Sequence, residues 1–184
     1  PKHRYDYTPT IGCQESHRAR HAMISIDHHI KFTDAGAIDA SAKGSGSTRM
    51  TSIGIWEGPI ARSLDNQNMS DNAPTETAKQ IRASVGKGMW GMATPPQWEI
   101  TQTELFGILM YLHRLKKKHG NQSHTRRILI SSDCQTGIKM IGTAMKKGYG
   151  TGRDDMSATI EAICYLMNEF ETVRLIYTPG HRGI

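Results

Sequence analysis

The sequence predicts an α/β domain with a mixed five-stranded sheet, in which three antiparallel strands precede parallel strands and helices flank the sheet. Two observations support this fold class. Residues 30–38 and 50–56 are short apolar segments on either side of a Gly- and Ser-rich stretch, a pattern typical of a β-hairpin. From residue 101 onward, helical and strand-like segments alternate, and strands joined through helices run parallel within one sheet.

The long helix expected at residues 101–118 is the clearest single element. Apolar residues recur in it with the i, i+3, i+4 and i+7 spacing of an amphipathic helix, at Leu105, Ile108, Leu109, Leu112 and Leu115. Gly120 ends this helix. A strand, two helices and a last strand follow, at residues 127–131, 135–147, 157–170 and 173–177.

A length of 184 residues fits one domain with appendages. We expect residues 1–29 to be a basic tether, because they mix basic, His and polar residues with little periodicity. Residues 30–184 then form the domain, in which residues 57–98 hold the third strand and a loop insertion. Because the chain begins at Pro1, we interpret it as an excised or processed piece of a longer protein.

The composition favours a polyanionic partner such as nucleic acid, because the net charge is +6 at pH 7 and the isoelectric point is about 9.3. No apolar run reaches the length of a membrane span, so we expect no membrane partner. Cys13, Cys134 and Cys164 are odd in number and widely spaced, which favours free thiols in a reducing compartment. We therefore expect an intracellular protein, in the cytoplasm, nucleus or mitochondrion.

Three acidic residues are placed by the predicted elements toward one edge of the sheet. Asp34 lies on the first strand, Glu104 in the first turn of the long helix, and Asp133 at the carboxyl end of the fourth strand. In open sheets, ligands gather at the carboxyl edge of parallel strands. Clustered carboxylates repel one another unless cations neutralise them, and Mg²⁺ prefers such oxygen ligands. The sequence therefore predicts a site for a divalent metal.

Alternatives remain open at two of these positions. Asp34 is our preferred first acid, but Asp39 has a similar sequence around it and lies closer along the chain to the segment around Gly54. Thr101 and Glu104 also have the spacing of a capping box, which is ordinary chemistry at a helix start and requires no catalytic role.

Five short motifs follow one another along the chain. They are Phe-Thr-Asp-Ala-Gly at 32–36, Ser-Ile-Gly-Ile-Trp at 52–56, Gln-Thr-Glu-Leu at 102–105, Ser-Asp-Cys-Gln at 132–135 and Tyr-Thr-Pro-Gly-His-Arg-Gly at 177–183. In order and in local sequence they resemble ribonuclease H of type 1 and the ribonuclease H domains of retroelements. This chain has Ala35 where the family usually has Gly, and the family's fourth acid would fall past Ile184, so we expect a C-terminally truncated domain.

The resemblance implies a metal-dependent endonuclease that hydrolyses the RNA strand of RNA–DNA hybrids. It implies two Mg²⁺ ions, or Mn²⁺, held by Asp34, Glu104 and Asp133, and a role for His181 in product release or proton transfer. Such a domain stands alone or beside a reverse transcriptase in a retroelement polyprotein. The alternative function is a non-catalytic module that keeps the fold and binds nucleic acid or protein in a ribonucleoprotein assembly.

Basic residues near the helix ends are candidate phosphate contacts for a nucleic acid. They are Arg114, Lys116, Lys117, Lys118, Lys146 and Lys147. The last two precede Gly148 and Tyr149, and this segment resembles the basic segment with which some family members grip the hybrid. The basic run that ends the long helix has a simpler explanation as well, since positive charges there stabilise the helix dipole.

Overall fold

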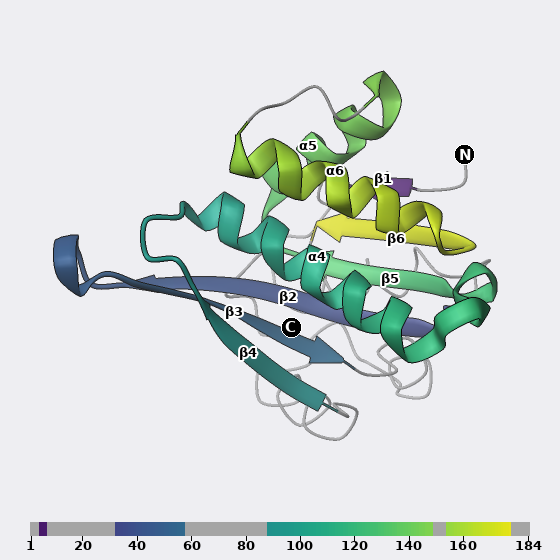
Figure 1. Ribbon diagram of the computed structural model, residues 1–184, viewed down its shortest axis with the longest axis horizontal. Coiled ribbons are helices and arrows are strands. Elements are labelled where there is room, and N and C mark those ends of the chain that lie inside the picture. The colour runs from purple at the N-terminus through teal and green to yellow at the C-terminus, as the bar shows by residue number, and fades with distance from the viewer. Residues whose placement is uncertain (1–3, 7–31, 58–87, 149–153, 178–184) are drawn as a thin grey trace, which may run out of the picture.

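The computed structural model describes residues 4–6, 32–57, 88–148 and 154–177. The described residues form one six-stranded sheet with helices packed on it (Figure 1). In chain order the elements are β1 (Arg4–Asp6), β2 (Asp34–Lys43), η1 (Gly46–Thr48), β3 (Met50–Glu57), β4 (Gly88–Thr94), α4 (Ile100–His119), η2 (Gly120–Thr125), β5 (Arg127–Ser132), α5 (Gln135–Lys147), α6 (Asp155–Asn168) and β6 (Thr172–Tyr177).

The strands lie in the order β1-β6-β5-β2-β3-β4. β2, β3 and β4 pair antiparallel, whereas β5 and β6 run parallel to β2 and to each other. The predicted mixed sheet, with three antiparallel strands followed by parallel ones, is confirmed for β2 to β6. β1 adds a sixth strand, parallel to β6, within the segment that the sequence predicts to be a tether.

β2 and β3 form a long hairpin that extends away from the rest of the sheet (Figure 1). The Gly- and Ser-rich residues expected to form a loop from residue 40 instead continue β2 as far as Lys43, because they pair with β3 up to Met50. The turn is built by Gly44 and Gly46, whose φ angles of 77° and 54° favour glycine. β2 therefore extends well beyond the end of its other neighbour, β5.

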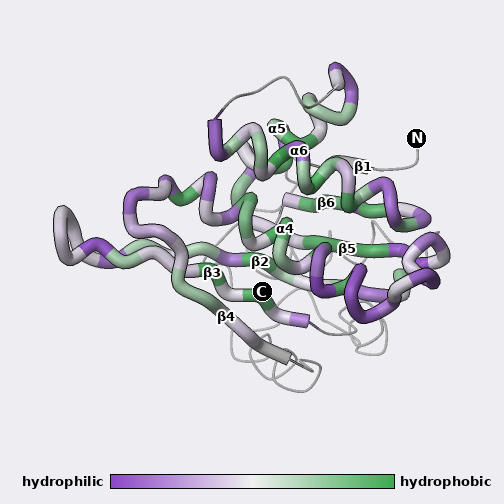
Figure 2. The backbone as a smooth tube through the Cα atoms, viewed as in Figure 1, coloured by the Kyte–Doolittle hydropathy of each residue, from purple (hydrophilic) through white to green (hydrophobic). Residues whose placement is uncertain are grey.

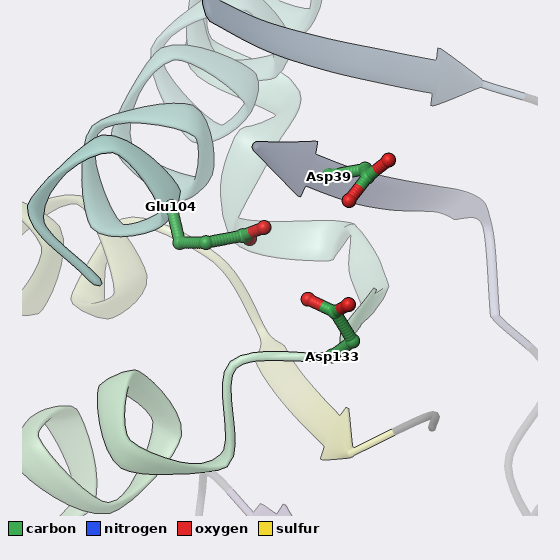
Figure 3. A group of neighbouring side chains, drawn as sticks. All are labelled: Asp39, Glu104 and Asp133. Carbon is green, nitrogen blue, oxygen red and sulfur yellow. The ribbon is translucent and has the colours of Figure 1, made fainter. Parts of the chain in front are cut away.

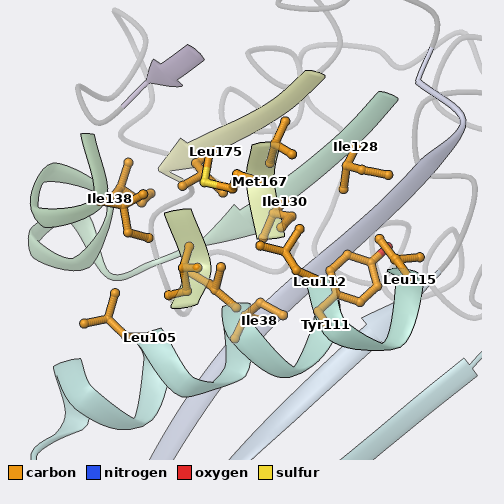
Figure 4. Close-up of a cluster of buried hydrophobic side chains, with 14 of the residues drawn as sticks. Ile38, Leu105, Tyr111, Leu112, Leu115, Ile128, Ile130, Ile138, Met167 and Leu175 are labelled. Atoms are coloured by element: carbon orange, nitrogen blue, oxygen red, sulfur yellow. The ribbon is translucent and has the colours of Figure 1, made fainter. Parts of the chain in front are cut away.

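α4 provides most of the core on one face of the sheet, where it packs on β2 and β3 and against α6 (Figures 1 and 4). Four of the five apolar residues predicted to face inward are almost fully buried: Leu105, Ile108, Leu112 and Leu115. They pack with isoleucines of the sheet, including Ile38, Ile53 and Ile130. Burial of each such side chain stabilises the fold by about 1.5–3 kcal/mol.

Gly107 allows α4 to approach the sheet closely. A Cβ atom built at this position would lie 2.5 Å from Cγ2 of Ile38, closer than real Cβ contacts allow. Gly107 lies one helical turn after Glu104. The absence of a side chain at Gly107 therefore helps to bring the carboxyl group of Glu104 against β2.

The hydropathy of the residues along the chain follows this architecture. Hydrophobic residues line β5 and β6, while hydrophilic residues gather at the C-terminal end of α4 (Figure 2). That end carries Lys116, Lys117, Lys118 and His119 in its last turn. Within the part of the chain that the structure describes, no helix has both the length and the apolar character needed to cross a bilayer.

Candidate metal site

The site lies at the carboxyl edge of β5, where β2 continues beyond β5 and is paired only with β3. The last residue pair between these strands is Ile38 with Ser132, so β5 ends one residue before β2 reaches Asp39. The side chain of Asp39 is exposed at this point. The backbone N–H of Ala40, the next residue, donates a hydrogen bond of 2.6 Å to Oε1 of Glu104. A side chain from α4 thus takes the place of a neighbouring strand.

Glu104 is a buried acid, with only 1% of its surface exposed. Its second carboxylate oxygen, Oε2, accepts a hydrogen bond of 3.0 Å from the hydroxyl of Ser132. The expected capping box is not formed, because α4 already begins at Ile100 with Glu99 as its N-cap residue. The carboxyl group of Glu104 therefore points at the sheet edge and not back at its own helix start.

Asp133 is placed by the turn that leads from β5 into α5. The backbone N–H of Cys134 donates to the hydroxyl oxygen of Ser132 at 3.1 Å, a local turn that serine favours. The thiol of Cys134 then caps α5 by accepting a hydrogen bond from the N–H of Gly137. This compact turn leaves the side chain of Asp133 exposed beside the end of β5.

Together, Asp39, Glu104 and Asp133 form a cluster in which one carboxylate oxygen from each residue lies within 4.8 Å of the others. Figure 3 shows the three side chains converging from β2, from α4 and from the end of β5. Two of the acids are exposed and one is buried, so the cluster opens to solvent on one side.

The environment of Glu104 raises the pKa of its carboxyl group to about 8. Burial is the largest cause, because desolvation disfavours the charged form, and the charge of Asp133 raises the pKa further. The hydrogen bonds from Ser132 and Ala40 oppose this rise. Without a cation, the cluster therefore holds its third negative charge only at a cost in free energy.

These residues fit a divalent metal ion. Carboxylate oxygens are the ligands that hard cations such as Mg²⁺ prefer. A cation would also remove the repulsion that raises the pKa of Glu104, and Asp39 and Asp133 are accessible from solvent. Asp39, Glu104 and Asp133 are therefore a candidate metal site.

Asp34, the preferred first acid from the sequence, lies at the start of β2, five residues before Asp39, and does not join this cluster. It pairs with Ile128 near the start of β5, whereas the cluster lies beyond the end of β5. Its Oδ1 atom lies 2.9 Å from Nε2 of His119, and both side chains are only 8% exposed. The structure thus brings the alternative, Asp39, to Glu104 and Asp133.

The basic residues predicted as phosphate contacts fall into two groups. Those of α4 lie near its C-terminal end, roughly 15–21 Å along the helix axis from Glu104 at 1.5 Å per residue. Three of them have acidic neighbours: Arg114 contacts Glu57, Lys116 contacts Glu169, and Lys118 lies 3.9 Å from Asp34. Lys117 is exposed at the same end, and Lys146 and Lys147 are exposed in the last turn of α5, the helix that follows Asp133.

Some expected features lie outside the described residues. These are His181, Tyr149, Cys13, most of the predicted tether and most of the predicted insertion. Sequence reasoning also missed two groups that hold Glu104: the hydroxyl of Ser132 and the backbone N–H of Ala40. A serine just before a strand-end aspartate was the only sequence signal for them.

No family model and no curated protein matches the chain in sequence. Solved structures do match its fold. The RNase H domain of PFV matches with a TM-score of 0.53 at 10% identity, covering 83% of this chain and 82% of that domain. LC9-RNase H1, a type 1 RNase H with the type 2 active-site motif, matches with a TM-score of 0.51 at 12% identity, covering 83% of this chain and 65% of that one.

LC11-RNase H1, crystallised in complex with an RNA/DNA hybrid, matches with a TM-score of 0.50 at 10% identity, covering 82% of this chain and 88% of that one. Identities this low establish the fold alone. The five strands from β2 to β6 and the helices packed on them agree with these structures. The chain therefore has the ribonuclease H-like fold, with three carboxylates gathered at the carboxyl edge of its parallel strands.

Proposed function

We propose that this protein is a metal-dependent endonuclease that hydrolyses the RNA strand of RNA–DNA hybrids. The observation that carries the proposal is the cluster of Asp39, Glu104 and Asp133 within 4.8 Å, on a ribonuclease H-like fold. The chain has only 10% sequence identity to LC11-RNase H1, the neighbour crystallised with an RNA/DNA hybrid, so the substrate is inferred from fold and site together.

The three carboxylates divide the work between binding and orientation. Asp39 and Asp133 are exposed and would be the ligands of a bound ion on the solvent side. Glu104 is buried, and hydrogen bonds from Ala40 and Ser132 fix its carboxylate. Two Mg²⁺ or Mn²⁺ ions, when bound, would supply an activated water and would stabilise the charge on the leaving oxygen. The role of the chain is to hold three oxygens in place at an edge that the phosphodiester can reach.

Binding of a hybrid needs exposed positive charge along its phosphate backbone, and not only at the metal site. Among the predicted contacts, we favour Lys146 and Lys147, because their side chains are exposed at the end of the helix that starts beside Asp133. Lys117 offers a second exposed charge at the far end of α4. Neutralisation of phosphates by such residues makes binding fall steeply with salt concentration.

The setting in the cell remains part of the proposal. The sequence motifs other than the first, which include those of Glu104, Asp133 and His181, support a domain of a retroelement polyprotein that works beside a reverse transcriptase. The free thiols of Cys134 and Cys164 support a reducing, intracellular compartment. His181 is kept as a candidate for product release or proton transfer on the resemblance of its Gly-His motif.

Cleavage of a labelled RNA–DNA hybrid tests the proposal. The full-length protein should cut the RNA strand in Mg²⁺ or Mn²⁺, and chelation with EDTA should stop the reaction. Asp133→Asn should abolish cleavage, because it removes one carboxylate of the cluster. Asp155→Asn is the matched control, since Asp155 is an exposed aspartate in the first turn of α6, outside the cluster.

The same assay decides against the enzyme if it is wrong. Tight, salt-sensitive binding of the hybrid with no cleavage in either metal would point to the alternative function, a non-catalytic nucleic-acid-binding module. If the protein neither binds nor cleaves the hybrid, an RNA–DNA hybrid is excluded as its substrate and as its ligand.

A further inference from the structure

Glu104 is held by hydrogen bonds to both of its carboxylate oxygens. Oε1 accepts from the backbone N–H of Ala40 on β2, at 2.6 Å, and Oε2 accepts from the hydroxyl of Ser132 at the end of β5, at 3.0 Å. The two donors come from neighbouring parallel strands. A glutamate side chain is otherwise free to adopt many rotamers, so two donors from different strands select one orientation.

The direction of the Ser132 hydroxyl is determined by its own partners. Its oxygen accepts the backbone N–H of Cys134 at 3.1 Å, and that N–H can only donate. The hydroxyl carries a single proton, and the hydrogen bond that it donates goes to Oε2 of Glu104. The turn that exposes Asp133 and the bond that orients Glu104 therefore share one side chain.

The turn into α5 does not require the hydroxyl proton of Ser132. Acceptance of the Cys134 N–H needs only the oxygen of residue 132, as in other turns that serine and threonine make. Ser132 is 2% exposed, so its proton has no bulk solvent to donate to. In the described structure it donates to a carboxylate that belongs to the metal site.

We infer that Ser132 is a positioning residue of the metal site, which holds the Glu104 carboxylate in the orientation that a divalent cation requires. An ionised carboxylate has about four lone-pair positions, and the bonds from Ala40 and Ser132 use two of them. The remaining positions stay available within 4.8 Å of the oxygens of Asp39 and Asp133. Ser132 acts through Glu104 and is not itself a ligand. This inference rests on the proposed metal site but can be tested without catalysis.

The test compares the affinity of the protein for Mn²⁺, measured by titration calorimetry, across four proteins. They are the wild type, Ser132→Ala, Ser132→Thr and Ser123→Ala. Loss of a hydrogen bond to a metal ligand typically costs about 10-fold or more in affinity, so Ser132→Ala should bind Mn²⁺ about 10-fold more weakly. Ser132→Thr keeps the hydroxyl and should restore the affinity.

Ser123→Ala is the matched control. Ser123 is also a fully buried serine that donates to a backbone oxygen, that of Gly120, but it lies beyond the C-terminal end of α4. Its loss should lower the melting temperature and leave Mn²⁺ affinity at the wild-type value. Thermal melts of all variants identify any effect that arises from unfolding.

The outcomes separate this inference from the proposed function. Unchanged Mn²⁺ affinity in Ser132→Ala overturns the positioning role, even if the wild type cleaves hybrids. An equal loss in Ser123→Ala and Ser132→Ala overturns it as well, because the effect is then one of general stability. A wild type that binds Mn²⁺ without cleaving refutes the endonuclease but still allows Ser132 to be judged. A wild type that binds no Mn²⁺ overturns the metal site and the role of Ser132 together.

Discussion

β2 presents one aspartate at its start and another near its middle, in opposite electrostatic surroundings. At the start of the strand, Asp34 lies 2.9 Å from His119 and 3.9 Å from Lys118, and the hydroxyl of Thr33 donates to it. Five residues later, Asp39 lies beside two further acids, Glu104 and Asp133. The first aspartate lies beside basic side chains, whereas the second lies among carboxylates that a bound cation would stabilise.

This difference separates an acid that links structural elements from one that we propose to bind a metal ion. A buried acid with its own basic partners ties elements together, here the end of α4 to the start of β2. Carboxylates that lie close together repel one another, and a bound cation removes that cost in free energy. Charge balance around each carboxylate therefore distinguishes Asp34 from Asp39, although their local sequences are similar.

The largest expected effect comes from replacing each of the two aspartates separately with asparagine. Asp39→Asn should reduce cleavage of an RNA–DNA hybrid by at least about 100-fold. Loss of a residue that only supports a metal ligand costs up to about 100-fold, and loss of a ligand should cost at least as much. Asp34→Asn should leave the rate per folded molecule near that of the wild type. Single-turnover rates measured on folded fractions check this, and a loss of activity in Asp34→Asn as large as in Asp39→Asn would contradict the assignment.

The next largest effect is on the stability of the fold, and it comes from the surroundings of Asp34. His119→Ala should lower the free energy of unfolding by about 3 kcal/mol, because it leaves a buried acid without its closest partner. Lys118→Ala should cost less than about 1 kcal/mol, since that side chain is 63% exposed. Urea denaturation of both variants decides the point, and equal losses would show that the His119–Asp34 pair has no special weight.

The pH dependence of stability gives the smallest effect. The pKa of Glu104 is raised from 4.5 to about 8, so the folded state favours the neutral form of this side chain. The contribution of Glu104 to the stability of the fold is therefore full below about pH 4.5 and is lost as the pH rises through about 8. In EDTA at pH 8, Glu104→Gln should therefore be more stable than the wild type. The shift from 4.5 to about 8 corresponds to an upper limit of about 5 kcal/mol at roughly 1.4 kcal/mol per pKa unit, and we expect about 2 kcal/mol because the folded chain relaxes around the charge.

Thermal melts of Glu104→Gln and the wild type between pH 4 and pH 8 measure this difference. The gap should close toward pH 4, where Glu104 is protonated in both folded and unfolded chains. A gap that stays constant with pH would mean that the substitution acts through packing and not through charge.

Local sequence patterns were sufficient for most of the fold. The helix predicted at residues 135–147 has the same bounds in the structure, and the long helix differs by one residue at each end. These elements depend on apolar periodicity and on glycines at their ends, which are properties of neighbouring residues. β1 was missed because its three residues carry no periodic pattern.

The choice between Asp34 and Asp39 was beyond such patterns. It depends on how β2 aligns with β5, and residues that pair there, such as Ile38 and Ser132, are far apart in the chain. The end of β2 was misjudged for a related reason, since Ser41 and Ala42 have little preference for strands but pair with β3. Contacts between distant segments decide both questions.

The uneven ends of β2 and β5 also determine where the chain can change in length. An insertion or deletion of one residue between Asp34 and Asp39 would shift every later side chain of β2 to the opposite face and would remove Asp39 from Glu104. The hairpin turn around Gly44 and Gly46 lies past the last residue that the site uses, and its residues are exposed. Natural variation in length should therefore accumulate in that turn, while the short segment before Asp39 keeps a constant number of residues.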